Sequence, residues 1–148
     1  MDKLQKQVQE FHREVIGGLT SPAKPELRDA FRRASLIAEE AAETVFALVG
    51  NADAQSILVA QMLSVLNLRT RAGKHKADVV EAIDGCIDTI IVSYGTLEAI
   101  GVDGEPFADE VMRTNMAKKG GKIDANGKLQ KPAGWTPPDI AGVLEKVK

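Results

Sequence analysis

Apolar residues recur three or four positions apart through most of this chain, and strict two-residue alternation is nearly absent. Close to the N-terminus the repeat consists of Leu4, Val8, Phe11 and Val15. This spacing places apolar side chains on one face of an α-helix, whereas a half-buried strand alternates apolar and polar residues. The sequence therefore predicts an all-α fold, a helical bundle with very little strand.

Helix-breaking residues divide the pattern into five helices and a short terminal one. The first helix, at residues 4–15, should end at Gly17 and Gly18, before a proline-containing linker. The second should start near Pro25 and end at Gly50. Three more helices are expected at residues 53–68, 77–100 and 106–119, and Gly101 suits the C-cap of the one at 77–100. Thr136 should cap the short terminal helix, with Pro137 at its first position.

Two of these helices have apolar faces that predict how the bundle packs. The third, at residues 53–68, is apolar on much of its circumference, so it should be buried inside the domain or against another subunit. We therefore expect a homodimer or a dimer of dimers. The second helix should bury one stripe of side chains, namely Leu27, Phe31, Ala34, Ala38, Ala41, Val45 and Leu48.

The tail after residue 120 is rich in glycine and proline and differs from the rest of the chain. Asn126-Gly127 is a strong signal for a tight turn between two short extended pieces, 122–124 and 128–130, so the tail should be hairpin-like. Trp135 has two readings, an anchor for the tail or a platform for a base, and the anchor is favoured because a lone tryptophan is usually a packing residue.

Size and charge exclude several classes of protein. The 148 residues fit a single domain, 1–148, and a net charge of −2 gives no global attraction to nucleic acid or an anionic membrane. The N-terminus has no apolar signal-peptide core. The single cysteine, Cys86, forms no intrachain disulfide and lies in an apolar helical pattern, so we expect a core residue in a cytoplasmic protein.

Acidic residues cluster in the second helix, in the run EEAAE. Glu39, Glu40 and Glu43 are three or four positions apart, so their side chains are neighbours on the helix surface. Apolar residues flank the run on both sides, and no basic residue stands one turn beyond it. Carboxylates crowded in this way need a countercharge if they are buried, and a divalent cation supplies one. Taken alone, the run would usually be a solvated helix face.

The fourth helix repeats this pattern. Glu81, Asp84 and Asp88 are three and four positions apart and share one face. Two such helices make a plausible site for Mg²⁺, which prefers oxygen ligands, with Mn²⁺ as an alternative. A zinc site would need more histidine or cysteine, and a ferritin-like di-iron site would need a Glu-x-x-His motif, which neither His12 nor His75 completes.

The two acidic motifs resemble those of a known family. EEAAE and EAID look like the EExxE and ExxD motifs of the MazG-like all-α nucleotide pyrophosphohydrolases, a group that includes dimeric dUTPases and phosphoribosyl-ATP pyrophosphatase. The similarity covers roughly Ala30 to Leu144, including RTNMAKKGGKIDANGKLQKPAGWTPPDI. The resemblance implies a four-helix core. The interval between Glu43 and Glu81 is longer than in many members, which bears on substrate choice.

The resemblance also implies roles for eight residues. Glu39 would be the catalytic residue that orients or deprotonates the attacking water. The metal ligands for Mg²⁺ would be Glu40, Glu43, Glu81 and Asp84. Asn115 and Lys118 would contact phosphate, and Asp88 would bind the sugar or a further metal, so these three form the substrate-binding set.

The implied reaction converts a nucleoside triphosphate into a monophosphate and pyrophosphate, with dUTP or a related deoxynucleotide favoured, in a housecleaning role. Two alternatives stay open: a phosphoribosyl-ATP pyrophosphatase, and a non-catalytic helical interaction protein. The basic segment 69–76 could reach the triphosphate, but a solvated turn is the favoured reading.

Overall fold

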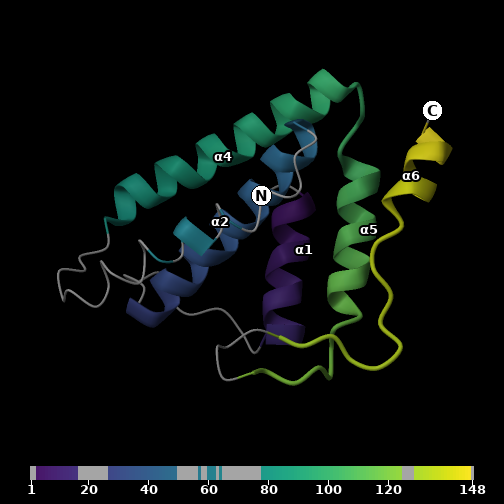
Figure 1. Ribbon diagram of the computed structural model, residues 1–148. Helices are drawn as coiled ribbons and strands as arrows, with labels where there is room; N and C mark the ends of the chain where they lie inside the picture. The colour runs from purple at the N-terminus through teal and green to yellow at the C-terminus, as the bar shows by residue number, and fades with distance from the viewer. Residues whose placement is uncertain are drawn as a thin grey trace. The chain divides into compact units, whose positions relative to one another are not determined.

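The computed structural model describes residues 3–16, 27–49, 57, 60–62, 64, 78–124 and 129–147, and these residues form an all-α structure, as predicted (Figure 1). Of the third predicted helix, only residues 57, 60–62 and 64 are described, and they are helical. The rest of that helix, the stop at Gly17 and Gly18, and the basic segment 69–76 lie outside the described residues. The elements are α1 (Lys3–Phe11), a π-helix η1 (His12–Ile16), α2 (Leu27–Val49), α4 (Val79–Ile100), α5 (Glu105–Met116) and α6 (Ile140–Val147).

The chain divides into two compact units. One consists of Met1–Ser21 and Ile87–Lys148, and the other of Pro22–Cys86. The boundary falls within helix α4, so the first two turns of that helix belong to one unit and the remainder to the other. The prediction of one domain over the whole chain stays a prediction.

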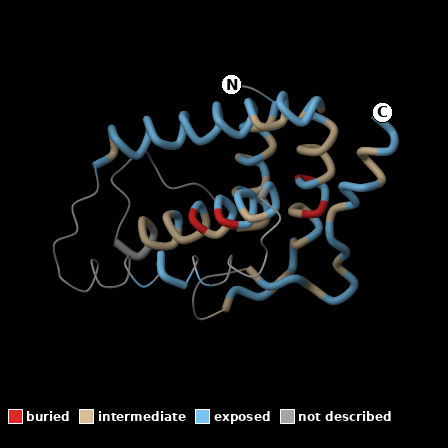
Figure 2. The backbone as a smooth tube through the Cα atoms, turned by 45° about the horizontal axis from the view of Figure 1, so that its top comes forward, coloured by how far each residue is buried: buried red, intermediate tan, exposed pale blue. Residues whose placement is uncertain are grey.

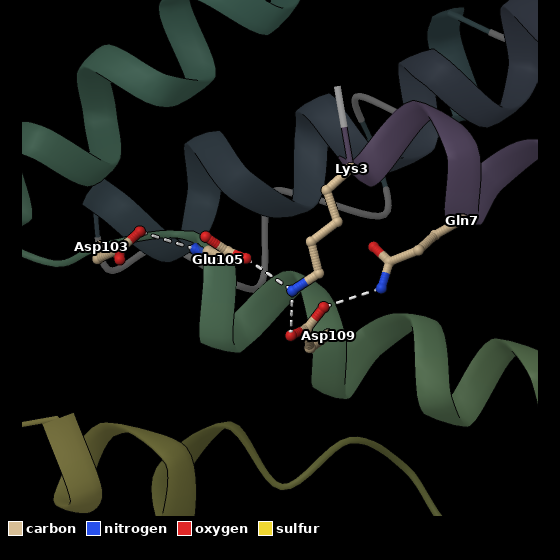
Figure 3. Close-up of polar contacts among 5 residues, drawn as sticks. All are labelled: Lys3, Gln7, Asp103, Glu105 and Asp109. Carbon is tan, nitrogen blue, oxygen red and sulfur yellow. Dashed lines mark hydrogen bonds and ion pairs between the residues drawn. The ribbon is translucent and has the colours of Figure 1, made fainter. Parts of the chain in front are cut away.

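Helix α5 contacts α1 through a network of charged and polar side chains (Figure 3). The Lys3 ammonium donates to Glu105 Oε1 at 2.6 Å and to Asp109 Oδ2 at 2.7 Å, and Gln7 Nε2 donates to Asp109 Oδ1 at 2.8 Å. The backbone N–H of Glu105 donates to Asp103 Oδ1, which satisfies one of the open donors at the start of α5. The pKa of Asp109 is lowered, chiefly by the hydrogen bond from Lys3.

Helix α5 also contacts α6, and Figure 1 shows α5 between α1 and α6. The start of α6 corrects the prediction made from sequence. The helix begins at Ile140, and Asp139 caps it, because Asp139 Oδ1 accepts from the Gly142 N–H at 3.0 Å and the Asp139 carbonyl accepts from Val143. Thr136 therefore lies outside the helix, and Pro137 is not its first residue.

The segment between α5 and α6 contains the predicted paired pieces. Ile123 forms an antiparallel bridge with Leu129, and the Gln130 N–H donates to the Lys122 carbonyl at 2.7 Å. This pairing confirms the hairpin-like tail, whereas the Asn126-Gly127 turn itself lies outside the described residues. No longer strand occurs in the part of the chain that the structure describes.

Both ends of α4 follow from local sequence. Asp78 Oδ1 accepts from the N–H groups of Val80 and Glu81, so Asp78 is the N-cap. At the other end Gly101 has a positive φ of 86°, and the Val102 N–H donates to the Leu97 carbonyl. This Schellman arrangement confirms the predicted glycine stop.

Buried side chains lie on α2 and α5. Among the described residues they are Ala38, Ala42, Met112 and Thr114 (Figure 2). On α2, Ala38 is buried as predicted. The next buried residue is Ala42, four positions further on and on the same helix face, whereas the predicted Ala41 is exposed. Two further members of the predicted stripe, Val45 and Leu48, are also exposed.

Helix α4 is exposed along nearly its whole length in the single chain (Figure 2). Its exposed apolar side chains include Val80, 75% exposed, and Val92, 68% exposed. Cys86 is also exposed, contrary to the expectation of a core residue, and the apolar side chains Ile83 and Ile87 near it on α4 are exposed as well. None of the described helices combines the length and the apolar character needed to span a membrane.

Candidate active site

The first acidic motif lies in the middle of α2. Glu39 is half-buried, and Glu40 and Glu43 are exposed. Glu39 and Glu40 lie between the buried residues Ala38 and Ala42, and Glu43 directly follows Ala42. A regular helix therefore sets the spacing of these three carboxylates, and the small buried alanines fix which side of α2 faces inward.

The second acidic motif lies at the start of α4. Because Asp78 caps the helix, Glu81 falls in its first turn, and Asp84 follows one turn later. Both carboxylates are exposed in the single chain, as is Asp88. Carboxylates near a helix N-terminus are stabilised by the helix dipole, so this position suits negatively charged side chains.

All five carboxylates of the two motifs belong to the same compact unit, Pro22–Cys86. They supply only oxygen ligands, a donor set that fits Mg²⁺ better than zinc. However, no three histidine, cysteine, aspartate or glutamate side chains of the described residues are close enough together to hold a metal ion. The assignment of Glu40, Glu43, Glu81 and Asp84 as metal ligands, and of Glu39 as catalytic residue, therefore stays a prediction.

The predicted substrate-binding residues Asp88, Asn115 and Lys118 belong to the other unit. Asn115 and Lys118 contact each other at the end of α5, where Lys118 Nζ donates to Asn115 Oδ1 at 2.7 Å. Both side chains are half-buried. The structure therefore brings together this pair, whereas their contact with substrate remains a prediction.

A neighbouring feature was missed at the level of sequence, namely the surroundings of Trp135. The indole Nε1 donates to the Thr114 carbonyl at 2.8 Å, and Lys118 Nζ lies 5.6 Å from the ring centroid. Lys131 Nζ lies 4.3 Å from the same centroid. The tail thus anchors on α5 through Trp135, which agrees with the favoured reading of this residue. The sequence contains one signal for this contact, namely Lys131, four positions before the tryptophan.

A pocket of about 560 Å³ lies where α4 turns into α5. Its lining includes Tyr94, Glu98 and Asp103. None of the eight predicted site residues lines this pocket.

Comparison with known protein families identifies the chain. The model of the phosphoribosyl-ATP pyrophosphohydrolase family matches residues 5–115, three quarters of the length, including both acidic motifs. No curated protein matches the chain. The match bears out the resemblance to the MazG-like nucleotide pyrophosphohydrolases and decides against a non-catalytic interaction protein. The chain therefore belongs to the phosphoribosyl-ATP pyrophosphohydrolase family and is a pyrophosphohydrolase that acts on the acid anhydride bond of a nucleotide.

Proposed function

We propose that this enzyme hydrolyses the α–β phosphoanhydride of a nucleoside triphosphate in the presence of Mg²⁺ and releases a monophosphate and pyrophosphate. The observation that carries the proposal is the presence of two acidic motifs on α2 and α4, both inside the residues matched by a pyrophosphohydrolase family. The oxygen-only donor set supports Mg²⁺, with Mn²⁺ as an alternative.

Glu40, Glu43, Glu81 and Asp84 would hold the metal. When bound, Mg²⁺ supplies positive charge that neutralises the phosphate chain and makes water more acidic. Glu39, half-buried beside Ala38 and Ala42, is the proposed general base. It takes the proton of the attacking water as the new P–O bond forms, and the bond from phosphorus to the bridging oxygen breaks to release pyrophosphate.

The preferred substrate is proposed to be dUTP or a related deoxynucleoside triphosphate, on the strength of the similarity of the motifs and tail to dUTP-hydrolysing proteins. Phosphoribosyl-ATP is the second candidate, and the description of the matched family favours it. Both substrates contain the same anhydride, so the chemistry of the carboxylates does not separate them.

The test is a panel of substrates. Pyrophosphate release would be measured from canonical and modified nucleoside triphosphates, from deoxynucleoside triphosphates and from phosphoribosyl-ATP, each with Mg²⁺ and with chelator. We expect release only with Mg²⁺, and the highest kcat/KM for dUTP or another deoxynucleotide. A preference for phosphoribosyl-ATP would establish the second candidate, and absence of release from every substrate would contradict the proposed reaction.

We also propose that the enzyme is a homodimer or a dimer of dimers. Exposed apolar side chains along α4 support association, because large apolar patches on a single chain usually mark interaction sites. Light scattering should give at least twice the mass of 15.9 kDa. Ile91→Glu should weaken association, whereas the conservative Ile91→Leu should not. A stable monomer at micromolar concentration would contradict this assembly.

A further inference from the structure

Arg32 lies on the face of α2 that contains the first acidic motif. It stands seven residues before Glu39 and eleven before Glu43 in one uninterrupted helix, Leu27–Val49 (Figure 1). With about 3.6 residues per turn, these three positions lie within about 40° of one another around the helix axis. The rise of about 1.5 Å per residue separates Arg32 from Glu39 by about 10 Å along that axis. The helix therefore aligns an arginine with two of the predicted site carboxylates.

Arg32 differs from the neighbouring Arg33 in its surroundings. Arg32 is half-buried, and it forms no hydrogen bond or ion pair with another residue among those that the structure describes. Arg33 is exposed, lies about 100° further round the helix and has an interaction of its own. A partly buried cation is stabilised by an anion that accepts its hydrogen bonds. Arg32 is thus suited to an anionic ligand in a way that Arg33 is not.

The charges along this face indicate which part of a nucleotide would lie beside Arg32. The carboxylates of the motif repel phosphate oxygens, and a metal ion offsets this repulsion only close to the motif. On the same face Ser35 and Leu36 stand between Arg32 and Glu39, and neither is charged. Arg32 is therefore the nearest cation before the motif on this face. A phosphate chain whose α-phosphate lies at the carboxylates can extend its outer phosphates towards Arg32.

We propose that Arg32 binds the outer phosphates of the substrate, the group that leaves as pyrophosphate. This inference rests on the proposed function and holds for both candidate substrates, because both release pyrophosphate. As water attacks the α-phosphorus, its proton passes to Glu39, and the electron pair of the breaking bond passes to the bridging oxygen of pyrophosphate. A guanidinium offers paired donors that match two phosphate oxygens, so it stabilises this developing charge. Arg32 and all the proposed metal ligands belong to the same compact unit, Pro22–Cys86.

Calorimetry with inorganic pyrophosphate tests this contact without turnover. Titrations of the full chain in Mg²⁺ would compare the wild type with Arg32→Gln. Loss of hydrogen bonds to a charged group should raise the Kd of pyrophosphate about tenfold or more. Arg32→Lys keeps the charge and loses the planar fork, so it should recover only part of the affinity. The matched control is Arg33→Gln, which removes the same group from the next position and should leave the Kd nearly unchanged.

A purely structural role for Arg32 would change a different measurement. Disturbed packing of α2 would weaken Mg²⁺ binding, because this helix contains the proposed metal ligands Glu40 and Glu43. A contact with phosphate predicts that Arg32→Gln binds Mg²⁺, in the absence of pyrophosphate, as tightly as the wild type or more tightly. The reason is that the variant removes a positive charge near the carboxylates. Weaker Mg²⁺ binding, with a matching loss of helix by circular dichroism, would overturn the phosphate contact.

Steady-state kinetics separates this inference from the proposed reaction. If the enzyme hydrolyses nucleotide and Arg32→Gln lowers kcat/KM about tenfold or more while Arg33→Gln does not, the inference is supported. If hydrolysis proceeds and the two variants behave alike in both kcat/KM and pyrophosphate Kd, the inference is overturned while the reaction stands. If the wild-type enzyme releases no pyrophosphate from any nucleotide, the proposed reaction fails, and the calorimetric comparison of the two variants still decides whether Arg32 binds pyrophosphate.

Discussion

Glu110 Oε1 accepts a hydrogen bond of 2.9 Å from the backbone N–H of Asp139, which joins helix α5 to the start of α6. The same carboxylate receives two hydrogen bonds from the Arg113 guanidinium, at 2.7 and 2.8 Å. Asp139 in turn caps α6 with its own side chain. These contacts link a charged pair on α5, a backbone amide and a helix cap, so the attachment of the C-terminal helix should respond to pH and to substitution of either acid.

The first prediction concerns pH. The bonds from Arg113, and next the Asp139 N–H, lower the pKa of Glu110 from 4.5 to about 2. A depressed carboxyl pKa contributes stability above the unfolded value, and this contribution is lost as pH falls from about 4.5 to about 2. NMR titration of the Glu110 carboxyl should give a midpoint near 2. Thermal unfolding of Glu110→Gln should depend less on pH in this range than that of the wild type. Glu145→Gln, at an exposed position of α6, is the control, and an ordinary midpoint for Glu110 would contradict the attachment.

The second prediction concerns the cap of α6. Asp139→Ala removes the acceptor for the Gly142 N–H and should lower the free energy of unfolding by about 1 kcal/mol. Thr136→Ala removes the cap expected from sequence and should have little effect, because Thr136 lies outside the helix. Chemical denaturation of both variants measures the difference. Equal losses in the two variants would show that the helix begins earlier than Ile140.

The third prediction concerns the turn that presents Trp135. Gly134 has a positive φ of 79°, as the third residue of a type II turn requires. Gly134→Ala should destabilise this turn by about 1–2 kcal/mol, because a side chain is strained in the left-handed region. Gly134→Asn should cost less, since asparagine tolerates that region. Hydrogen exchange of the Trp135 indole N–H would report the loosening, and equal exchange in all three proteins would contradict the role of the turn.

Local features of the fold were predictable because each depends on a few neighbouring residues. Gly101 ends α4, and residues 122 and 130 pair as the Asn126-Gly127 signal indicates. The predicted cap of α6 was wrong, since Thr136 and Asp139 are both good capping residues by type, and in the structure Asp139 caps the helix while its backbone N–H donates to Glu110. On α2 the prediction was right for Ala38 and wrong for Ala41, because Ala42 is buried in its place, and a wide apolar stripe does not define which of its members meets a neighbour.

In the candidate site, too, the arrangement within one helix was predictable from sequence, whereas contacts between distant segments were not. Helical spacing places Glu39, Glu40 and Glu43 together, and it places Glu81 and Asp84 together, because each set lies on one helix. The approach of two helices depends on packing between segments far apart in sequence, which periodicity alone does not specify. The contact of Lys131 with Trp135 depends on the tail folding back on α5, and residue spacing gives no direct signal for it.

The central claim, that carboxylates of α2 and α4 jointly hold Mg²⁺ for hydrolysis, is tested most directly by pyrophosphate release from Glu43→Gln and Asp84→Asn. Removing either proposed ligand should lower kcat/KM about 100-fold or more with no loss of folding. Mutation of residues that only hydrogen-bond to a metal ligand already lowers metal affinity or activity about 10–100-fold. The matched control is Glu98→Gln, an exposed acid of α4 outside the motif, which should keep full activity. Near-wild-type release in Mg²⁺ by Glu43→Gln or Asp84→Asn would contradict the claim.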